Sequence, residues 1–195
     1  MAPLYLETNF LMSFAYGQHS DTEPLLQQIE AKQVEIIMPE VCLVEALAAW
    51  RNKRSRLLAI TSGYSEHQRE LSRWQSVVDA PDASDMFRDL PVKLELANTT
   101  VLDRLLDCFK RLEPRTTFIS GDRAWLDPAM RVSRINGYAD DYICSAIIHD
   151  ARTRSAASYF LTENKDVHEP TVVADLASVA VAVLKTPTEA MTKYP

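Results

Sequence analysis

The sequence predicts an α/β fold in which a central, mostly parallel sheet is covered by helices on both faces. Two observations predict this three-layer α/β/α arrangement. Short apolar runs typical of buried strands alternate along the chain with longer segments, and the apolar residues of the longer segments recur at helical spacing. The 195 residues, 47% of them hydrophobic, suffice for one sizeable core. Because no repeat or low-complexity tract separates two folding units, we expect a single domain over residues 1–195.

The chain opens with a predicted strand followed by two predicted helices. Residues 3–6 (PLYL) form a short apolar run that ends at Glu7, and Thr8 then precedes NFLMSFAYG, whose large apolar residues have helical spacing. A second helix is expected over residues 22–32, where Thr22 can cap the N-terminus and aliphatic residues form a stripe. The predicted order is therefore strand, acidic turn, helix, helix.

A second strand and a long helix follow. Residues 34–38 (VEIIM) are apolar enough to form a buried strand, and Pro39 suits the first turn of the next helix. That helix should run through EVCLVEALAAW and beyond Arg56, because nothing interrupts its pattern. It therefore carries Glu45 in its interior, among apolar neighbours.

The middle of the chain is predicted to be mostly helical, and it interrupts the alternation of strands and helices. We expect helices over about residues 63–115, as an insertion or extension, with Pro81 and Pro91 interrupting them. Alternation then resumes. The remaining elements are expected as a strand at 116–120, an irregular segment at 121–137, a helix at 137–154, a strand at 158–162, a helix at 169–178, a strand at 181–184 and a turn of helix at 187–193.

Composition excludes several classes of protein. A formal net charge of -6 argues against a generally basic nucleic-acid binder, although a local basic patch can coexist with an acidic total. No apolar run approaches the length needed to cross a bilayer, and the start of the chain lacks the pattern of a secretory signal. Cys42, Cys108 and Cys144 show no paired spacing. We therefore expect a cytoplasmic protein with reduced thiols.

Four acidic residues are predicted to converge. Functional groups in an open parallel sheet collect beyond the carboxyl ends of its strands, and Glu7 and Asp166 follow two of the predicted strands. Glu45 and Asp141 lie on helices among apolar residues, where burial of a lone carboxylate costs several kcal/mol. A bound dication compensates several carboxylates at once. Oxygen ligands without nearby histidine or cysteine favour a hard cation, Mg²⁺ or Mn²⁺.

Each acid also has a purely structural interpretation. Glu7, and either Asp140 or Asp141, can cap the helix that follows it. A buried salt bridge is the best alternative for Glu45, and a surface loop is the default for Asp166. These interpretations stay open for each residue singly, so the metal site depends on the four acids acting together.

Four motifs, in this order, resemble those of the PIN domain family, which includes many bacterial toxin ribonucleases. The first is a strand followed by an acid, and the second is a helix with an inward glutamate. The third is an aspartate opening an apolar helix, and the fourth is a strand ending in threonine with further polar residues. The matching segments are LYLETNFL (Glu7, Thr8, Asn9), IIMPEVCLVEAL (Glu45), ADDYICSAII (Asp141, with Asp140 as the alternate) and YFLTENKDV (Thr162, Asn164, Asp166).

The resemblance implies a ribonuclease that hydrolyses RNA phosphodiester bonds through a metal-activated water, with Mg²⁺ or Mn²⁺ as cofactor. It implies that the metal is held by Glu7, Glu45, Asp141 and Asp166. Asn164 joins these acids as a catalytic residue. Thr8 and Asn9 position the first acid and the phosphate, and Thr162 contacts the substrate. A toxin or RNA-processing role, an antitoxin or other protein partner, and a homodimer are implied by analogy with relatives.

One basic residue is added to the predicted substrate contacts from helix geometry. Arg56 lies eleven residues after Glu45, which is about three helical turns, so the two share a helix face. The whole run WRNKRSR is equally well explained as a solvated helix face.

Two alternatives to an active ribonuclease remain. Glu7 stands where the family usually has aspartate, and Asn164 where many members have aspartate, which favours an inactive PIN-like module that binds RNA or a protein partner. A phosphatase on a doubly wound sheet also needs clustered acids. The segment ETNF after the first strand lacks the paired aspartates typical of such phosphatases, which weakens that alternative.

Overall fold

The structure is a computed structural model that describes residues 1–71, 73, 80–120, 138–154 and 156–195. The described residues form two units. The first unit comprises Met1–Ala46 and Leu105–Pro195, and the second comprises Leu47–Arg104. The sequence predicted a helical insertion within one domain, and the second unit begins earlier than the 63–115 expected for that insertion. The predicted irregular segment at 121–137 lies outside the described residues.

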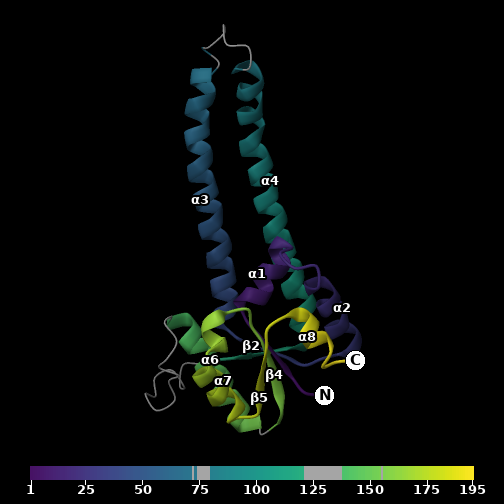
Figure 1. The fold of residues 1–195 in the computed structure, drawn as a ribbon. Coiled ribbons are helices and arrows are strands. Elements are labelled where there is room, and N and C mark those ends of the chain that lie inside the picture. The colour runs from purple at the N-terminus through teal and green to yellow at the C-terminus, as the bar shows by residue number, and fades with distance from the viewer. Residues whose placement is uncertain (72, 74–79, 121–137, 155) are drawn as a thin grey trace. The chain divides into compact units, whose positions relative to one another are not determined.

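The first unit contains a five-stranded sheet in which all neighbouring strands are parallel (Figure 1). The strand order across the sheet is β3-β2-β1-β4-β5. The strands are β1 (Leu4–Leu6), β2 (Ile36–Pro39), β3 (Thr116–Ile119), β4 (Ser158–Leu161) and β5 (Val181–Leu184). The central strand β1 pairs with β2 on one side and with β4 on the other, although β4 lies far from it in sequence. The predicted parallel sheet is therefore confirmed.

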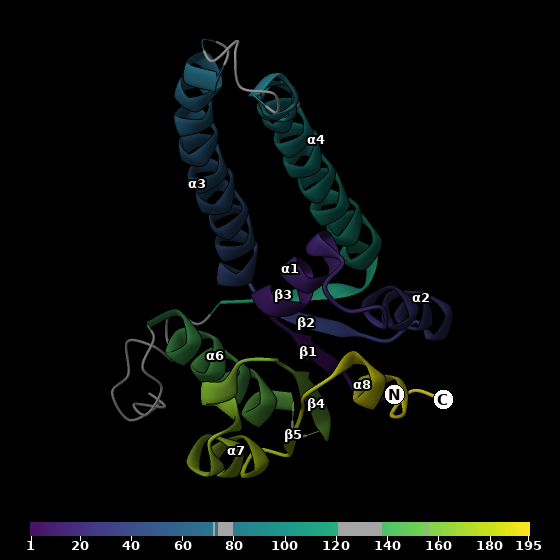
Figure 2. The same ribbon diagram turned by 45° about the horizontal axis from the view of Figure 1, so that its top comes forward.

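Helices pack on both faces of this sheet, as the sequence predicted. Figure 2 shows α1 and α2 on one side of the strands and α6 and α7 on the other. The helices and 3-10 turns of this unit are α1 (Thr8–Tyr16), α2 (Thr22–Lys32), η1 (Glu113–Arg115), α6 (Tyr138–Arg154), η2 (Lys165–His168), α7 (Pro170–Ala177) and α8 (Pro187–Met191). The confirmed architecture is a three-layer α/β/α fold. None of the described helices holds an apolar stretch long enough to cross a membrane.

Local sequence explains where α1 and α8 begin or end. Gly17 ends α1 with φ 63°, a left-handed conformation that glycine adopts without steric cost, and its N–H donates to the carbonyl oxygen of Phe14. Thr186 caps α8 by accepting a hydrogen bond from the backbone N–H of Glu189 at 3.2 Å. These ends fix where the connection between α1 and α2 begins and where the connection between β5 and α8 ends.

Helix α2 has the predicted bounds, but two residues at helix starts have roles that differ from the predictions. Pro39 is the last residue of β2, paired with Ile119 of β3, and not the first turn of a helix. The backbone N–H of Glu40 makes the next hydrogen bond to Ile119 at 3.0 Å, so the missing N–H of proline costs little at this strand end. At α2, Asp21 occupies the N-cap, while Thr22 is the first helical residue and donates its hydroxyl hydrogen bond to His19.

The second unit consists of parts of two long helices, α3 (Val41–Leu71) and α4 (Ala80–Leu112). Trp50 Nε1 donates to the carbonyl oxygen of Asn98 at 3.1 Å, and Arg54 Nη2 lies 2.6 Å from Glu95 Oε1. These contacts hold the two helices together. The predicted interruption at Pro91 was wrong, because α4 continues through it. A proline removes its own N–H from the helix, and the hydrogen-bonded turns on either side keep α4 continuous.

Candidate functional site

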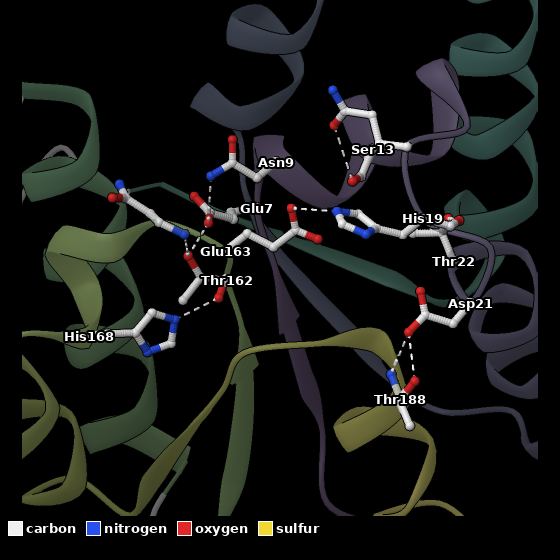
Figure 3. A network of polar contacts seen from close by, with 12 residues as sticks. Glu7, Asn9, Ser13, His19, Asp21, Thr22, Thr162, Glu163, His168 and Thr188 are labelled. Carbon is white, nitrogen blue, oxygen red and sulfur yellow. Dashed lines mark hydrogen bonds and ion pairs between the residues drawn. The ribbon is translucent and has the colours of Figure 1, made fainter.

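Glu7 occupies the centre of an acidic cluster in the first unit. It follows β1 directly, at the N-cap of α1, and only 2% of its surface is exposed. Its Oε1 accepts hydrogen bonds from the hydroxyl of Thr162 and from Nδ2 of Asn9, the latter at 3.2 Å (Figure 3). Thr162 follows β4, the neighbour of β1 in the sheet. The carboxyl ends of two adjacent parallel strands therefore meet at this carboxylate.

The environment of Glu7 disfavours its charged form. The pKa of this carboxyl is raised to about 7, mainly by burial and in part by the negative charges of Asp140 and Glu45. The hydrogen bonds from Thr162 and Asn9 lower the pKa but do not offset burial. A carboxylate held in this way gains stability from any cation that reaches it.

Glu45 lies on α3 and faces the start of α1. Thr8 Oγ1 donates a hydrogen bond of 2.7 Å to Glu45 Oε2, which fixes the rotamer of the half-buried glutamate. Burial raises the pKa of Glu45, and so does the charge of Asp140. Glu45 is therefore held close enough to the other acids for their charges to interact, as the sequence predicted for an inward glutamate.

The third acid of the cluster is Asp140, in the first turn of α6. Its pKa is raised by burial and by the charge of Asp166, and a hydrogen bond from Asn164 lowers it. The charge of Asp140 also raises the pKa of both Glu7 and Glu45. The sequence favoured Asp141 for this place and kept Asp140 as the alternate. Consecutive helical residues point about 100° apart, so the two aspartates point in different directions from α6.

The loop after β4 is held by its own polar groups. Thr162 Oγ1 accepts from the backbone N–H of Asn164 at 3.0 Å, and Asn164 Oδ1 accepts from the backbone N–H of Asp166 at 3.0 Å. His168 Nε2 lies 2.9 Å from the carbonyl oxygen of Thr162. This arrangement leaves Asp166 exposed beside Asp140, while Thr162 turns its hydroxyl toward Glu7.

The cluster brings together most of the residues that the sequence singled out, and it changes the role of some. Asn9 donates to Glu7, the first acid, which it was predicted to position. Thr8 donates to Glu45 instead, and Thr162, predicted to contact substrate, donates to Glu7. Arg56 lies in the second unit, on the exposed surface of α3. Nothing in the sequence singled out the contact of His19 with Glu163, at 3.3 Å, because its two partners lie far apart along the chain.

The chemistry of the cluster suits a hard dication. Among the described residues, no lysine, arginine or histidine forms an ion pair with Glu7, Glu45 or Asp140. Within that part of the chain, no three histidine, cysteine, aspartate or glutamate side chains stand close enough to form a ready-made metal site. Mg²⁺ does not need a ready-made set of protein ligands, because it keeps several waters and is bound through only one or two carboxylates. The residues present therefore fit such an ion as an open, water-completed site.

One family of known proteins matches most of the chain. A family model described as the PIN domain matches residues 4–167, from β1 to η2, and so spans all the acids of the cluster. No curated protein and no solved structure matches the chain.

Proposed function

The chain belongs to the PIN domain family, whose members are in general nucleases, and we propose that it is a Mg²⁺- or Mn²⁺-dependent ribonuclease that hydrolyses RNA phosphodiester bonds. The observation that carries this proposal is that Glu7 is buried where the carboxyl ends of β1 and β4 meet, with Glu45 held beside the start of α1 by Thr8. The charges of Asp140 and Glu45 act on Glu7. Their mutual repulsion, which no described basic side chain relieves, supports a divalent cation as the missing partner.

Three side chains would hold the cation directly or through water: Glu7, Glu45 and Asp140. We assign the third place to Asp140 rather than Asp141, because the charge of Asp140 acts on both glutamates. When bound, the ion would polarise a phosphoryl oxygen and supply an activated water for in-line attack. The exposed Asp166 would orient that water, and Asn164 would hold Asp140 by a hydrogen bond.

The hydroxyl and amide groups around the acids form hydrogen bonds with the carboxylates of those acids. Thr8 aims the carboxylate of Glu45, while Asn9 and Thr162 aim that of Glu7. We therefore describe these three as positioning residues. Contact of Arg56 with an RNA phosphate stays a prediction from helix spacing.

An inactive module that binds RNA or a protein partner is the second candidate. The contacts of Asn164 favour this candidate. Its side chain forms hydrogen bonds to the loop and to Asp140, and it brings no charge to the cluster. A toxin or RNA-processing role, an antitoxin and a homodimer stay predictions from the family resemblance.

The proposal is tested by incubating a panel of single-stranded RNAs with the protein in Mg²⁺, Mn²⁺ or EDTA. We expect cleavage that requires the metal and falls by about a hundredfold or more in Glu7→Gln and Glu45→Gln. Glu40→Gln is the matched control, since Glu40 is an exposed glutamate outside the cluster. Intact RNA in every lane, from folded protein that binds no Mn²⁺, would replace the proposal with the inactive module.

A further inference from the structure

A cavity of about 460 Å³ lies beside the acidic cluster, within the first unit. Its lining comes from three parts of the chain that the sheet brings together. Glu163, Lys165 and His168 follow β4, Lys185 follows β5, and His19 comes from the connection between α1 and α2. The cavity therefore opens at the same edge of the sheet as the cluster.

The cavity and the cluster share a wall. Thr162 donates its hydroxyl to Glu7 on one side, and its carbonyl oxygen is bonded to Nε2 of His168, which lines the cavity. Glu163, the next residue, extends from this wall toward His19 in Figure 3. A polymer that lies across Glu7 along the sheet edge toward β5 passes over this cavity.

The acidic groups of the lining already have partners. Glu163 pairs with His19 at 3.3 Å, and Asp21 Oδ2 accepts from the backbone N–H and the hydroxyl of Thr188 at 3.1 and 2.7 Å. By contrast, Lys165 and Lys185 are exposed and form no ion pair with any carboxylate in the described part of the chain. The cavity thus offers a ligand two ammonium groups that form no ion pair with a described carboxylate, although the carboxylates of Asp21 and Glu163 also line it.

We propose that this cavity is a subsite for one nucleotide of the RNA substrate, next to the scissile bond, with Lys165 and Lys185 binding its phosphate. The proposal rests on the ribonuclease function proposed above. A volume of about 460 Å³ lies in the range of small-ligand sites. Because neighbouring strands are about 4.8 Å apart, β5 lies about 10 Å from β1, so one RNA strand can contact both Glu7 and the cavity. Phosphate contact by lysine is independent of base, so the subsite sets register rather than sequence.

The test compares the double variant Lys165→Ala/Lys185→Ala with wild type in two assays. The first is steady-state cleavage of a single-stranded RNA in Mn²⁺. The second is binding of the same fluorescein-labelled RNA in EDTA, followed by anisotropy at several salt concentrations. The matched control is Lys32→Ala/Lys110→Ala, which removes two exposed lysines near the amino ends of β2 and β3.

We expect the double variant to raise KM and the dissociation constant roughly tenfold, with kcat within about twofold of wild type. The slope of log K against log salt should become shallower by about 0.7 for each phosphate that the variant no longer neutralises. A substrate with one neutral methylphosphonate at the position bound by the two lysines should lower the affinity of wild type and leave that of the double variant unchanged.

The outcomes distinguish a failure of the proposed subsite from a failure of the proposed ribonuclease function. If wild type cleaves and the double variant equals the Lys32/Lys110 control in KM, affinity and salt slope, the subsite is overturned and the nuclease stands. If wild type does not cleave, the proposed function fails, and the affinities measured in EDTA still decide whether the lysines bind RNA. Equal affinities there would overturn the subsite as well.

Discussion

Replacement of Glu7 by glutamine should make the metal-free protein more stable at alkaline pH. The pKa of Glu7 rises from 4.5 to about 7 on folding, so the folded state binds more protons than the unfolded state between these values. Stability therefore falls as pH rises from about 4.5 to about 7 and then levels off. At about 1.4 kcal/mol for each pKa unit, the ionised carboxylate costs about 3 kcal/mol at pH 8.

The amide of Glu7→Gln removes this cost and keeps the local hydrogen bonds. Thr162 and Asn9 both donate to the same oxygen of Glu7, and an amide carbonyl can accept both. In EDTA at pH 8 the variant should exceed wild type by up to about 3 kcal/mol in unfolding free energy. Near pH 4 the difference should vanish, because the carboxyl of wild type is then protonated.

Urea unfolding followed by far-ultraviolet circular dichroism at pH 4, 6 and 8 measures this difference. The exposed Glu40→Gln serves as control and should show no comparable gain. A Glu7→Gln variant that is less stable than wild type at pH 8 in EDTA would refute the reasoning. So would a gain that is the same at pH 4 and pH 8.

Three further perturbations probe the cluster and the packing around it. Mn²⁺ should raise the Tm of wild type at pH 8 by several degrees more than at pH 5, because protons compete for Glu7 at the lower pH. Scanning calorimetry at both pH values measures this difference, and an equal rise in Tm would contradict binding at the cluster. Thr162→Val should cost about 1–3 kcal/mol of stability and reduce cleavage, because Glu7 loses a donor, whereas Thr162→Ser should keep both; cleavage unchanged in the valine variant would exclude the positioning role. Arg111→Met should lower unfolding free energy by about 1–3 kcal/mol, because it leaves Glu23 and Glu30 without their partner, and RNA cleavage per folded molecule should stay unchanged.

The fold could be predicted from the sequence because its strands and helices have distinct periods. Buried strands such as Leu4–Leu6 and Ile36–Pro39 are short apolar runs, and the segments between them have helical spacing. The pairing of β1 with β4 required knowledge of the strand order, which no local pattern carries. The continuity of α4 through Pro91 was missed for a similar reason, since the cost of a proline is offset by the helix around it.

The sequence predicted a set of acids for the site, but it could not predict their orientations. Asp140 and Asp141 are neighbours in the first turn of α6, and only the start of the helix decides which of them faces Glu7. The hydrogen bond from Thr162 to Glu7 and the cavity near Lys185 depend on side chains that meet across strands. Such contacts between segments distant in sequence have no signature in a single sequence.

Single-turnover cleavage of one labelled RNA in Mn²⁺ by wild type, Asp140→Asn and Asp141→Asn tests the central claim most directly. The two variants remove the same charge from adjacent residues of α6, so each serves as the control for the other. We predict that wild type and Asp141→Asn cleave the RNA at comparable rates while Asp140→Asn is slower by about a hundredfold or more. No cleavage by folded wild type, or a loss confined to Asp141→Asn, would contradict the account.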